Sequence, residues 1–538
     1  MCNTSNTKFI LMSNLLEQAS LVMIPSGYKE DVVYSEIPLD GGGDLQFTRA
    51  SNGTRVNSAG NVQVVPWNFM QQSNAFSTSP WSKANTTLTS GQTDPNGGSN
   101  AWKVEFASGG NAYLGQFGIG QIGVVTISAY FRADSTTTIG FNDGSAFANS
   151  ITIGTTWQRY EFSYTVTAGQ CNMQIDNYFG VSPSGQAKTF YIYGAQLNIG
   201  STAQPYFPTT DRLNVPRLTY QNGGGGCPSL LLEKQSTNLV YPSEDFSPWN
   251  LFNSATISTN TTISPDGTQN ADTLNFASSA ISQVFSNQGD GTNTAHTVSI
   301  YAKSSSGKKF RIKIANSTTG GDEFSSNLTT TNDWQRFDFT FTCPVTHIAI
   351  CNESSGGTGT IQIWGAQLEA SNYVTSYINT TSSSATRVAD ACYKTGISSL
   401  IGQTEGVLFW DGIATQGNYN QLIFIKDSSA NQFIGLTVAS GIIYGEIYNS
   451  GYVQLFSIAI ASNESRFKLA LAYKTNDFAM YVNGTQVATA STGTTPTSFD
   501  DFYLGNTNNL RDWNCEVKQA ILFPTRLTNA ELASLTTI

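Results

Sequence analysis

The stretch FYIYGAQLNIGSTAQPYFPTTDR (Phe190–Arg212) occurs a second time as IQIWGAQLEASNYVTSYINTTSSSATR (Ile361–Arg387). Both copies run from a strand-like segment through Gly-Ala-Gln-Leu to a Thr-Thr pair. A pattern of this length does not recur by chance. The middle of the 538-residue chain is therefore predicted to be a duplicated β module, with this stretch closing each copy and leading to the next.

Further segments repeat in the same order around the two copies. Phe76 corresponds to Phe246, and Trp157 corresponds to Trp334. Aromatic and polar residues alternate in WQRYEFSYTV and in WQRFDFTFT, which indicates half-buried strands. Asp-Pro-Asn-Gly and Pro-Asp-Gly are turn signals between strands. Each copy is therefore predicted to be an antiparallel two-sheet sandwich or jelly roll.

The last part of the chain has a different pattern of strands. Asn483-Gly484 predicts a hairpin between FAMYV and TQVAT. A short terminal helix is expected after Thr528 as its N-cap. Strands followed by such a helix resemble the concanavalin-A-like (laminin-G-like) jelly rolls.

Near the N-terminus, Leu15, Leu16, Ala19 and Met23 repeat at helical spacing.

The predicted fold class is all-β, with tandem antiparallel sandwich domains. The expected parts, in order, are an N-terminal attachment segment at 1–64, a first sandwich at 65–212, a Gly-rich connector at 213–236, a second sandwich at 237–390 and a concanavalin-A-like lectin domain at 391–538.

Composition excludes several classes of function. Charged residues are only 12% and the net charge is −10, with no basic cluster longer than Lys308-Lys309, which argues against nucleic-acid binding. No apolar run approaches the roughly 18 residues that a membrane span needs, and we expect no signal peptide. The seven scattered cysteines contain no C-x-x-C, which favours buried reduced thiols over a disulfide framework or a zinc site.

Four longer segments resemble the virion appendage proteins of tailed bacteriophages, namely tail-fibre, head-fibre and receptor-binding proteins. These segments are SLVMIPSGYKEDVVYSEIP (20–38), LQFTRASNGTRVNSAGNV (45–62), VPRLTYQNGGGGCPSLLLEKQSTNLVYPSEDFSPW (215–249) and WGAQLEASNYVTSYINTT (364–381). The resemblance implies carbohydrate-binding-module-like sandwiches in a structural protein on the particle surface. It implies partners among other virion proteins through the N-terminal segment and a homo-oligomer, with a trimer as the candidate.

Catalytic motifs are not found. The only histidines, His296 and His347, lie in strand patterns, and no G-x-S-x-G is present. Glycoside hydrolysis needs two carboxylates roughly 5–10 Å apart, whereas the acidic residues of the C-terminal domain are scattered: Glu405, Asp411, Glu446 and Glu516. We therefore predict no catalytic residues, no cofactor and no metal site, and the chain is not expected to be an enzyme.

Sugar binding needs aromatic faces together with amide and carboxylate groups. The glycan-binding candidates of the C-terminal domain are Tyr419, Tyr444, Tyr448, Tyr452, Trp513, Asn418 and Asp512. Trp410 is expected in the core, and Trp81, Trp102 and Trp249 are weaker candidates in the sandwiches.

The favoured function is adhesion to host-surface polysaccharide through the C-terminal domain. Two alternatives stay open: a purely structural head-fibre or capsid-decoration protein, and a polysaccharide depolymerase. A virion that is assembled in the host cytoplasm and released by cell lysis would expose this chain on its surface outside the cell, without a signal peptide.

Overall fold

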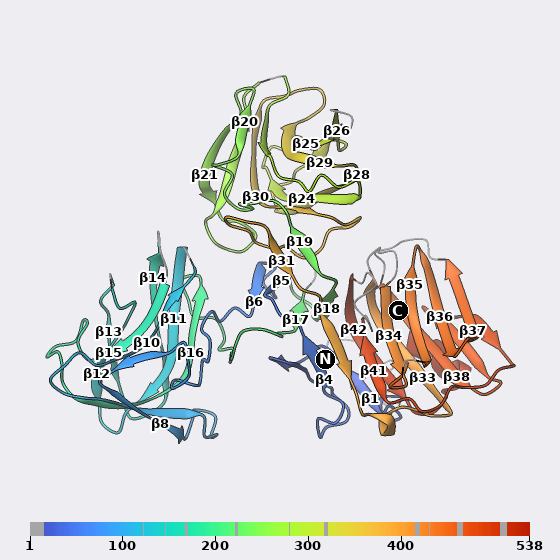
Figure 1. Cartoon of the computed structure of the whole chain (residues 1–538), viewed down its shortest axis with the longest axis horizontal. Helices are drawn as coiled ribbons and strands as arrows, with labels where there is room; N and C mark the ends of the chain where they lie inside the picture. The colour runs from blue at the N-terminus through green and yellow to red at the C-terminus, as the bar shows by residue number, and fades with distance from the viewer. Residues whose placement is uncertain are drawn as a thin grey trace. The chain divides into compact units, whose positions relative to one another are not determined.

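The computed structural model describes residues 15–121, 123–145, 147–166, 171–220, 224–278, 280–316, 321–414, 420–429, 431–459, 466–505 and 514–538. The regular secondary structure of these residues is almost entirely antiparallel sheet, which confirms the all-β prediction (Figure 1). The chain divides into two compact units, Val64–Leu213 and the residues on both sides of it, Met1–Gln63 with Asn214–Ile538. No helix in the described ranges is long and apolar enough to cross a membrane.

The unit Val64–Leu213 is a sandwich of two five-stranded sheets (Figure 1, blue to green). One sheet has the order β13 (Ser150–Ile153), β12 (Thr137–Asn142), β15 (Cys171–Asp176), β10 (Tyr113–Ile119) and β7 (Ser82–Ala84). The other has the order β14 (Gln158–Val166), β11 (Gly123–Arg132), β16 (Lys188–Ile199), β9 (Ala101–Phe106) and β8 (Thr86–Gln92). The core between the sheets contains Val104, Ile127 and Leu197.

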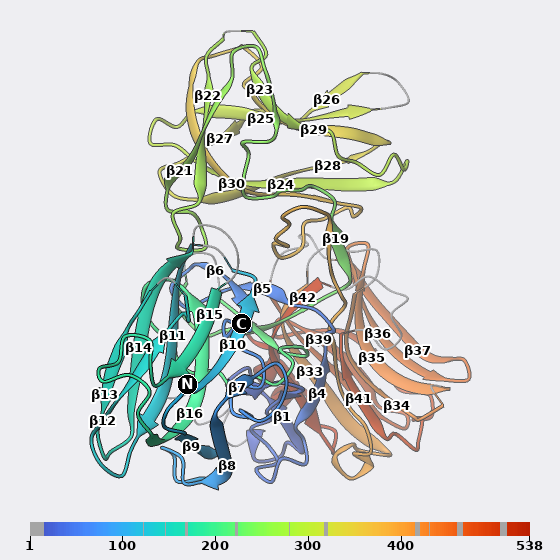
Figure 2. The same ribbon diagram turned by 60° about the vertical axis from the view of Figure 1, so that its left-hand side comes forward.

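The second sandwich repeats this arrangement of strands (Figure 2, upper part). One sheet has the order β20 (Asn250–Phe252), β23 (Gln283–Ser286), β29 (Val345–Asn352), β25 (Lys309–Asn316) and β26 (Asp322–Phe324), with β27 (Leu328–Thr329) also on β25. The other has the order β21 (Thr256–Thr262), β22 (Ala271–Phe276), β30 (Gly359–Glu369), β24 (Ala295–Lys303) and β28 (Gln335–Thr342). Corresponding strands occupy corresponding places, so the duplication is confirmed.

The Gly-Ala-Gln-Leu stretch forms a bulge in the middle strand of one sheet of each sandwich. The strand register shifts opposite Gly194 in β16 and opposite Gly365 in β30. These glycines have φ angles of +67° and +66°, a region that side chains with a Cβ rarely adopt. The next polar residue holds the exit segment: Gln196 accepts a hydrogen bond from the Phe207 N–H in the first sandwich. The stretch therefore fixes how the chain leaves each module.

The C-terminal domain is a sandwich of an eight-stranded and a nine-stranded sheet. The eight-stranded sheet has the order β17 (Arg217–Thr219), β18 (Ser229–Glu233), β42 (Asn514–Phe523), β33 (Glu405–Ala414), β38 (Arg466–Lys474), β39 (Phe478–Val482) and β40 (Thr485–Ala490), with β1 (Leu21–Met23) also on β42. The nine-stranded sheet has the order β2 (Tyr28–Lys29), β3 (Val32–Val33), β4 (Leu45–Thr48), β32 (Ala391–Lys394), β41 (Asp501–Leu504), β34 (Asn420–Lys426), β35 (Gln432–Ala439), β36 (Ile442–Asn449) and β37 (Tyr452–Ala459).

Strands from the beginning of the chain complete both of these sheets. β1 pairs with β42, and β4 lies between β3 and β32. The expectation of a separate attachment segment at 1–64 is therefore wrong for its described part. The connector at 213–236 likewise enters a sheet through β17 and β18. Residues 1–14 lie outside the described ranges.

The expected helical pattern near the N-terminus is confirmed at Leu15 and Leu16, which are helical, but not at Met23. Met23 lies in β1 rather than in a helix, because Leu21 and Met23 alternate as strand residues and both enter the core. Two small sheets complete the fold: β5 (Gly53–Val56) with β6 (Val62–Val65), and β19 (Ser236–Asn238) with β31 (Ala385–Arg387).

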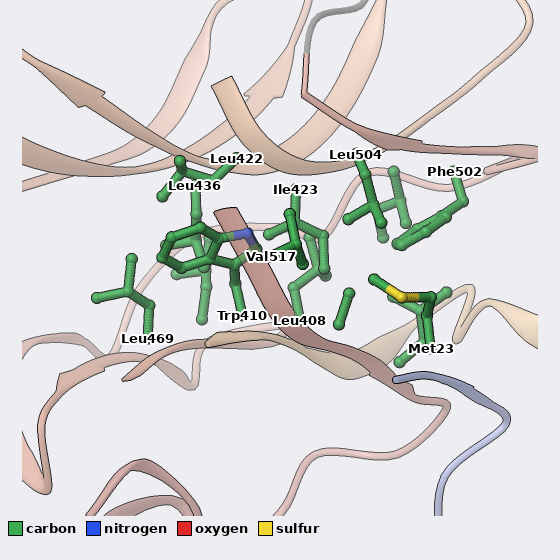
Figure 3. Packing of buried hydrophobic residues seen from close by; sticks show 14 of the residues in the cluster. Met23, Leu408, Trp410, Leu422, Ile423, Leu436, Leu469, Phe502, Leu504 and Val517 are labelled. Atoms are coloured by element: carbon green, nitrogen blue, oxygen red, sulfur yellow. The ribbon is translucent and has the colours of Figure 1, made fainter. Parts of the chain in front are cut away.

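The core of the C-terminal domain lies between its two sheets (Figure 3). Trp410 of β33 is fully buried there, as predicted, together with Leu436 and Phe502 from the opposite sheet. Figure 3 shows Met23, from the N-terminal strand, within the same cluster. The core therefore depends on side chains from segments that are hundreds of residues apart in sequence.

The other face of the eight-stranded sheet is covered by the terminal helix α2 (Asn529–Thr536). Leu532 and Leu535 of α2 pack with Phe409 and Phe523 of the sheet. Thr528 accepts a hydrogen bond from the Glu531 N–H, and the Glu531 side chain accepts one from the Thr528 N–H, which confirms the predicted N-cap. The Asn483-Gly484 hairpin is also confirmed, between β39 and β40.

A buried charge cluster joins four segments of the larger unit: Arg49, Arg217, Glu233, Arg387 and Asp390. Asp390 forms ion pairs with Arg49, at 2.9 Å, and with Arg217. Glu233 pairs with Arg217 at 2.6 Å and with Arg387 at 3.2 Å. All five side chains are at most 2% exposed. The cluster therefore ties β17 and β18 to the N-terminal segment and to the chain that enters β32.

Five cysteines are buried free thiols, as predicted: Cys171, Cys343, Cys351, Cys392 and Cys515. Cys227 is disulfide-bonded, so the prediction of reduced thiols is wrong for that residue.

Because of Glu244 in the second sandwich, we expect the stability of the fold to depend on pH. The Asn270 amide donates to both Glu244 and Asp266. Burial and the Asp266 charge raise the pKa of Glu244 to about 8. Because the folded state then favours the protonated carboxyl, stability should fall as the pH rises from about 4.5 towards 8.

We expect Glu244→Gln to remove this decline. Thermal unfolding should show variant and native chain with similar Tm values at pH 5 and a higher Tm for the variant at pH 9. Asp245→Asn, at the exposed neighbouring carboxylate, is the control and should not alter the pH profile. A native Tm that does not change between pH 5 and pH 9 would contradict the prediction.

Candidate functional site

Three of the predicted glycan-binding residues share one face of the nine-stranded sheet. Tyr444 and Tyr448 lie in β36, and Tyr452 begins β37. Ile443 and Ile447 of β36 enter the core, so the tyrosines that alternate with them lie on the opposite, outer face. The expectation that Tyr444 and Tyr448 share a face is confirmed. Asn418, Tyr419, Asp512 and Trp513 lie outside the described residues.

An aromatic row crosses this outer face. It consists of one residue from each of six consecutive strands: Tyr393 (β32), Tyr503 (β41), Phe424 (β34), Phe433 (β35), Tyr448 (β36) and Tyr452 (β37).

Ring contacts link the members of the aromatic row. Tyr393 stacks on Tyr503, with centroids 5.6 Å apart and planes at 17°. Tyr503 and Phe424 are register partners on neighbouring strands. At the other end, Phe433 stacks on Tyr448 at 4.9 Å and 12°, and Tyr448 meets Tyr452 edge-on at 5.3 Å. The row therefore has partly exposed rings at both ends and one buried ring, Phe424, between them.

Gly435 makes room for one ring of the row. Its register partner on β34 is Phe424, and a Cβ on Gly435 would lie 2.2 Å from the Phe424 ring. Phe424 itself is buried and contacts Phe433 at a centroid distance of 5.8 Å. A side chain at 435 would therefore push this ring out of the row.

We expect Gly435→Val to distort the row and to destabilise the domain by about 1–3 kcal/mol, the usual cost of overpacking. Chemical denaturation measures the loss. Gly451→Val is the control, since a Cβ there meets nothing within 4 Å. Equal stability of the two variants would show that Phe424 moves at no cost.

A buried carboxylate orients the exposed end of the row. Glu446 is 3% exposed and accepts hydrogen bonds from Thr437, at 2.7 Å, and from the Tyr452 hydroxyl, at 3.1 Å. Tyr452 itself is 56% exposed. Its ring is thus held by Glu446 and by Tyr448 while it faces solvent. A preoriented ring loses little conformational entropy when a ligand binds.

One cation lies against the middle of the row. The Lys426 ammonium is 4.4 Å from the centroid of the Tyr503 ring. Asp501, the register partner of Lys426, is largely buried, and this burial raises its pKa. The face thus combines aromatic surface with hydrogen-bonding side chains, which is the composition of a site for hydroxyl-rich ligands.

The carboxylates considered for glycoside hydrolysis are spread over both sheets of the C-terminal domain. Asp411 in β33 forms a bidentate ion pair with Arg466, at 2.7 and 2.6 Å. Glu446 is on the other sheet and holds Thr437 and Tyr452. Among the described residues, no group of three or more His, Cys, Asp or Glu side chains could hold a metal ion.

The two histidines have structural surroundings. His296 is buried between Asp290 and the Thr294 carbonyl, and its ring stacks on Phe341. His347 lies in β29 beside Phe285, and burial lowers its pKa.

Three tryptophans of the sandwiches were weaker candidates from the sequence. Each donates its indole N–H to a backbone carbonyl. Trp81 donates to the Gln72 carbonyl, Trp102 to Asn74 and Trp249 to Pro242. Trp81 and Trp249 also pack against Phe76 and Phe246 at corresponding places of the two sandwiches. These contacts are repeated elements of the module cores.

Sequence reasoning missed four of the six residues of the aromatic row: Tyr393, Phe424, Phe433 and Tyr503. A signal was available for Phe433, since Ile434, Leu436 and Val438 of β35 alternate into the core and leave Phe433 on the other face. For Tyr393 and Tyr503, which come from distant short strands, the strand order had to be known.

The fold and this face define a multidomain β-sandwich protein with an exposed aromatic surface. Comparison of the sequence with protein-family models and with curated proteins gives no match. Among solved structures, similar chains include carbohydrate-binding modules and other sugar-binding β-sandwich domains.

Three of these solved structures illustrate the similarity. The CBM40 module of the Ruminococcus gnavus IT-sialidase, bound to α2,3-sialyllactose, is 17% identical over 26% of this chain and 84% of its own, with a TM-score of 0.23. Domain 4 of the Geobacillus stearothermophilus arabinanase AbnA, in complex with arabinotriose, is 13% identical over 31% and 82%, with a TM-score of 0.24. The CBM22 tandem of Paenibacillus barcinonensis Xyn10C is 10% identical over 59% and 99%, with a TM-score of 0.20.

Proposed function

We propose that this chain is a non-enzymatic virion appendage protein of a tailed bacteriophage, and that it binds host-surface glycan through the aromatic row. The observation that carries the binding proposal is the row itself, with Tyr448 and Phe433 stacked on an outer sheet face. The resemblance of four sequence segments to phage tail-fibre, head-fibre and receptor-binding proteins supports the virion location.

The partial exposure of the row in the described part of the chain favours a ligand. In the described chain, α2 packs on the outer side of the eight-stranded sheet, whereas the row on the nine-stranded sheet retains partly exposed rings, with Tyr452 the most exposed. Pyranose rings present apolar faces that stack on aromatic side chains, and their hydroxyls suit Lys426 and the tyrosine hydroxyls. Weak single contacts would become firm in an oligomer, because linked sites raise the effective concentration.

An array of capsular polysaccharides and lipopolysaccharides, probed with the full chain, tests the proposal. We expect capture of at least one polysaccharide, and a loss of about tenfold or more in affinity for Tyr448→Ala, which removes a stacking surface worth at least about 1.4 kcal/mol. Tyr241→Ala, at an exposed tyrosine of the second sandwich, is the matched control. Capture of nothing, or equal capture by Tyr448→Ala, would refute binding through this face.

A purely structural role is the second candidate, and the edge strand β20 favours it. Leu251 and Phe252 of β20 are 48% and 51% exposed. The corresponding strand of the first sandwich, β7, has Lys83 and Ala84 at these places. An exposed apolar edge suits packing against another virion protein.

Exchanging Leu251 and Phe252 for the lysine and alanine of the first sandwich tests this second role. A structural role predicts loss of incorporation into particles with glycan capture unchanged. Normal incorporation of the exchanged chain would contradict it.

A further inference from the structure

We propose that the aromatic row binds an interior stretch of a linear glycan that runs across the strands and contacts at least four consecutive sugar rings. This inference rests on the proposed glycan-binding function and specifies the form of its ligand.

The direction of the ligand follows from the strand order. The six aromatic residues come one each from β32, β41, β34, β35, β36 and β37, and each of these strands is hydrogen-bonded to the next. The row therefore crosses the strands, with a shift of two residues between Phe424 and Phe433, because the register partner of Phe433 on β34 is Lys426. A ligand that follows the aromatic surface must cross the sheet rather than lie along one strand.

The length of the row sets the size of the ligand. Neighbouring strands lie about 4.8 Å apart, so six strands span roughly 24 Å. A pyranose unit in an extended chain has a length similar to this strand spacing. One sugar could contact only one or two of the rings, and a chain of at least four sugars is needed to reach from Tyr393 to Phe433 and beyond.

At β37 the row ends at an exposed edge of the described sheet. Among the described strands β37 is the last of its sheet, and two of its outer-face side chains, Tyr452 and Leu455, are 56% and 50% exposed. One polar group at this end, the Glu446 carboxylate, is buried and holds Thr437 and Tyr452. Recognition of a chain end needs polar groups that enclose the terminal hydroxyls. An exposed edge instead lets a polymer continue past the protein.

The middle of the row supplies a polar contact along such a chain. Lys426 of β34 lies over the Tyr503 ring and is the register partner of Phe433 on the neighbouring strand β35. Its ammonium has three donors and can bind a hydroxyl or a carboxylate of a sugar above it. The aromatic rings would thus carry the affinity and Lys426 would favour particular substituents.

Oligosaccharides of two, four and six sugars, cut from each polysaccharide that the array captures, test the inference by isothermal titration calorimetry with the full chain. We expect affinity to rise at least about tenfold from two to six sugars. Tyr393→Ala and Tyr452→Ala, at opposite ends of the row, should each weaken the six-sugar fragment several-fold, and at most one of them should weaken the two-sugar fragment.

The outcomes separate this inference from the proposed function. Full affinity for the two-sugar fragment, or no effect of Tyr393→Ala on the six-sugar fragment, overturns the interior-chain inference while glycan binding stands. Absence of capture on the array, or capture that Tyr448→Ala does not weaken, removes the proposed function and this inference with it. Tyr241→Ala should leave every affinity unchanged.

Discussion

The fragment Ala391–Ile538 expressed alone should not fold, although it contains every strand that the sequence assigned to the C-terminal domain. The domain also takes strands from elsewhere: β1 to β4 from the N-terminal segment, and β17 and β18 from the connector. These six strands place eight side chains in its core: Leu21, Met23, Val33, Leu45, Phe47, Leu218, Leu230 and Leu232.

The missing strands are expected to decide the stability of the fragment. Burying one such side chain is worth about 1.5–3 kcal/mol, so the loss of eight rivals the typical stability of a whole domain, about 5–15 kcal/mol. The fragment would also leave β32 and β42 without partners along one side, and unpaired edges promote aggregation.

The fragment Val64–Leu213 is the matched control for this experiment. It is of similar length, forms one compact unit and has its own core, so it should fold alone. Circular dichroism and denaturant titration compare the two fragments. A cooperative unfolding transition in Ala391–Ile538 would contradict the prediction, and it would also permit glycan assays on that fragment instead of the full chain.

Asp390→Ala should be the most damaging single substitution in the larger unit. The Asp390 carboxylate accepts hydrogen bonds from Arg49, from Arg217 and from the Glu233 N–H. Its removal leaves two buried guanidinium groups without this partner. Breaking a buried ion pair in this way costs about 3–5 kcal/mol.

Lys474→Ala is the control for the Asp390 variant. Lys474 pairs with Glu405 at 3.1 Å, but the lysine side chain is 50% exposed, and such surface pairs contribute at most about 1 kcal/mol. Urea denaturation of the three chains measures the difference. Similar midpoints for Asp390→Ala and Lys474→Ala would show that the cluster does not stabilise the fold.

The same cluster should make the fold sensitive to acid. Burial alone would raise the pKa of Glu233, but Arg387, Arg217 and the hydrogen bonds from Ser376 lower it to about 2. A carboxylate with a lowered pKa stabilises the fold above its ordinary pKa, near 4.5, and this contribution is lost as the pH falls towards 2. In Asp390→Ala the unfolding midpoint should move to higher pH.

The modules could be predicted from sequence because their signals are local. Three such signals are the alternation in β14 and β28, the Asn483-Gly484 turn and the Thr528 cap. Each depends only on residues that are close together in the sequence. The repeated Gly-Ala-Gln-Leu stretch was also visible, although its bulge at positive φ was not anticipated.

The candidate site could be predicted only in part. Tyr444, Tyr448 and Tyr452 come from adjacent strands, so their shared face follows from a spacing of four residues and one short turn. Tyr393 and Tyr503 join the same row from strands that are paired with each other but distant in sequence. Nothing in either segment alone indicates that pairing.

The sequence by itself thus determined the all-β class, the duplication and the faces of individual strands. The reason is that buried and exposed side chains alternate along each strand with a period of two. Only the tertiary structure decided which strands are neighbours. It placed β1 against β42, brought Asp390 to Arg49 and Arg217, and aligned six aromatic residues across one sheet. The physical reason is that hydrogen bonds between strands join backbone groups common to all residues, so strand order is set by how the buried side chains of the whole chain pack together.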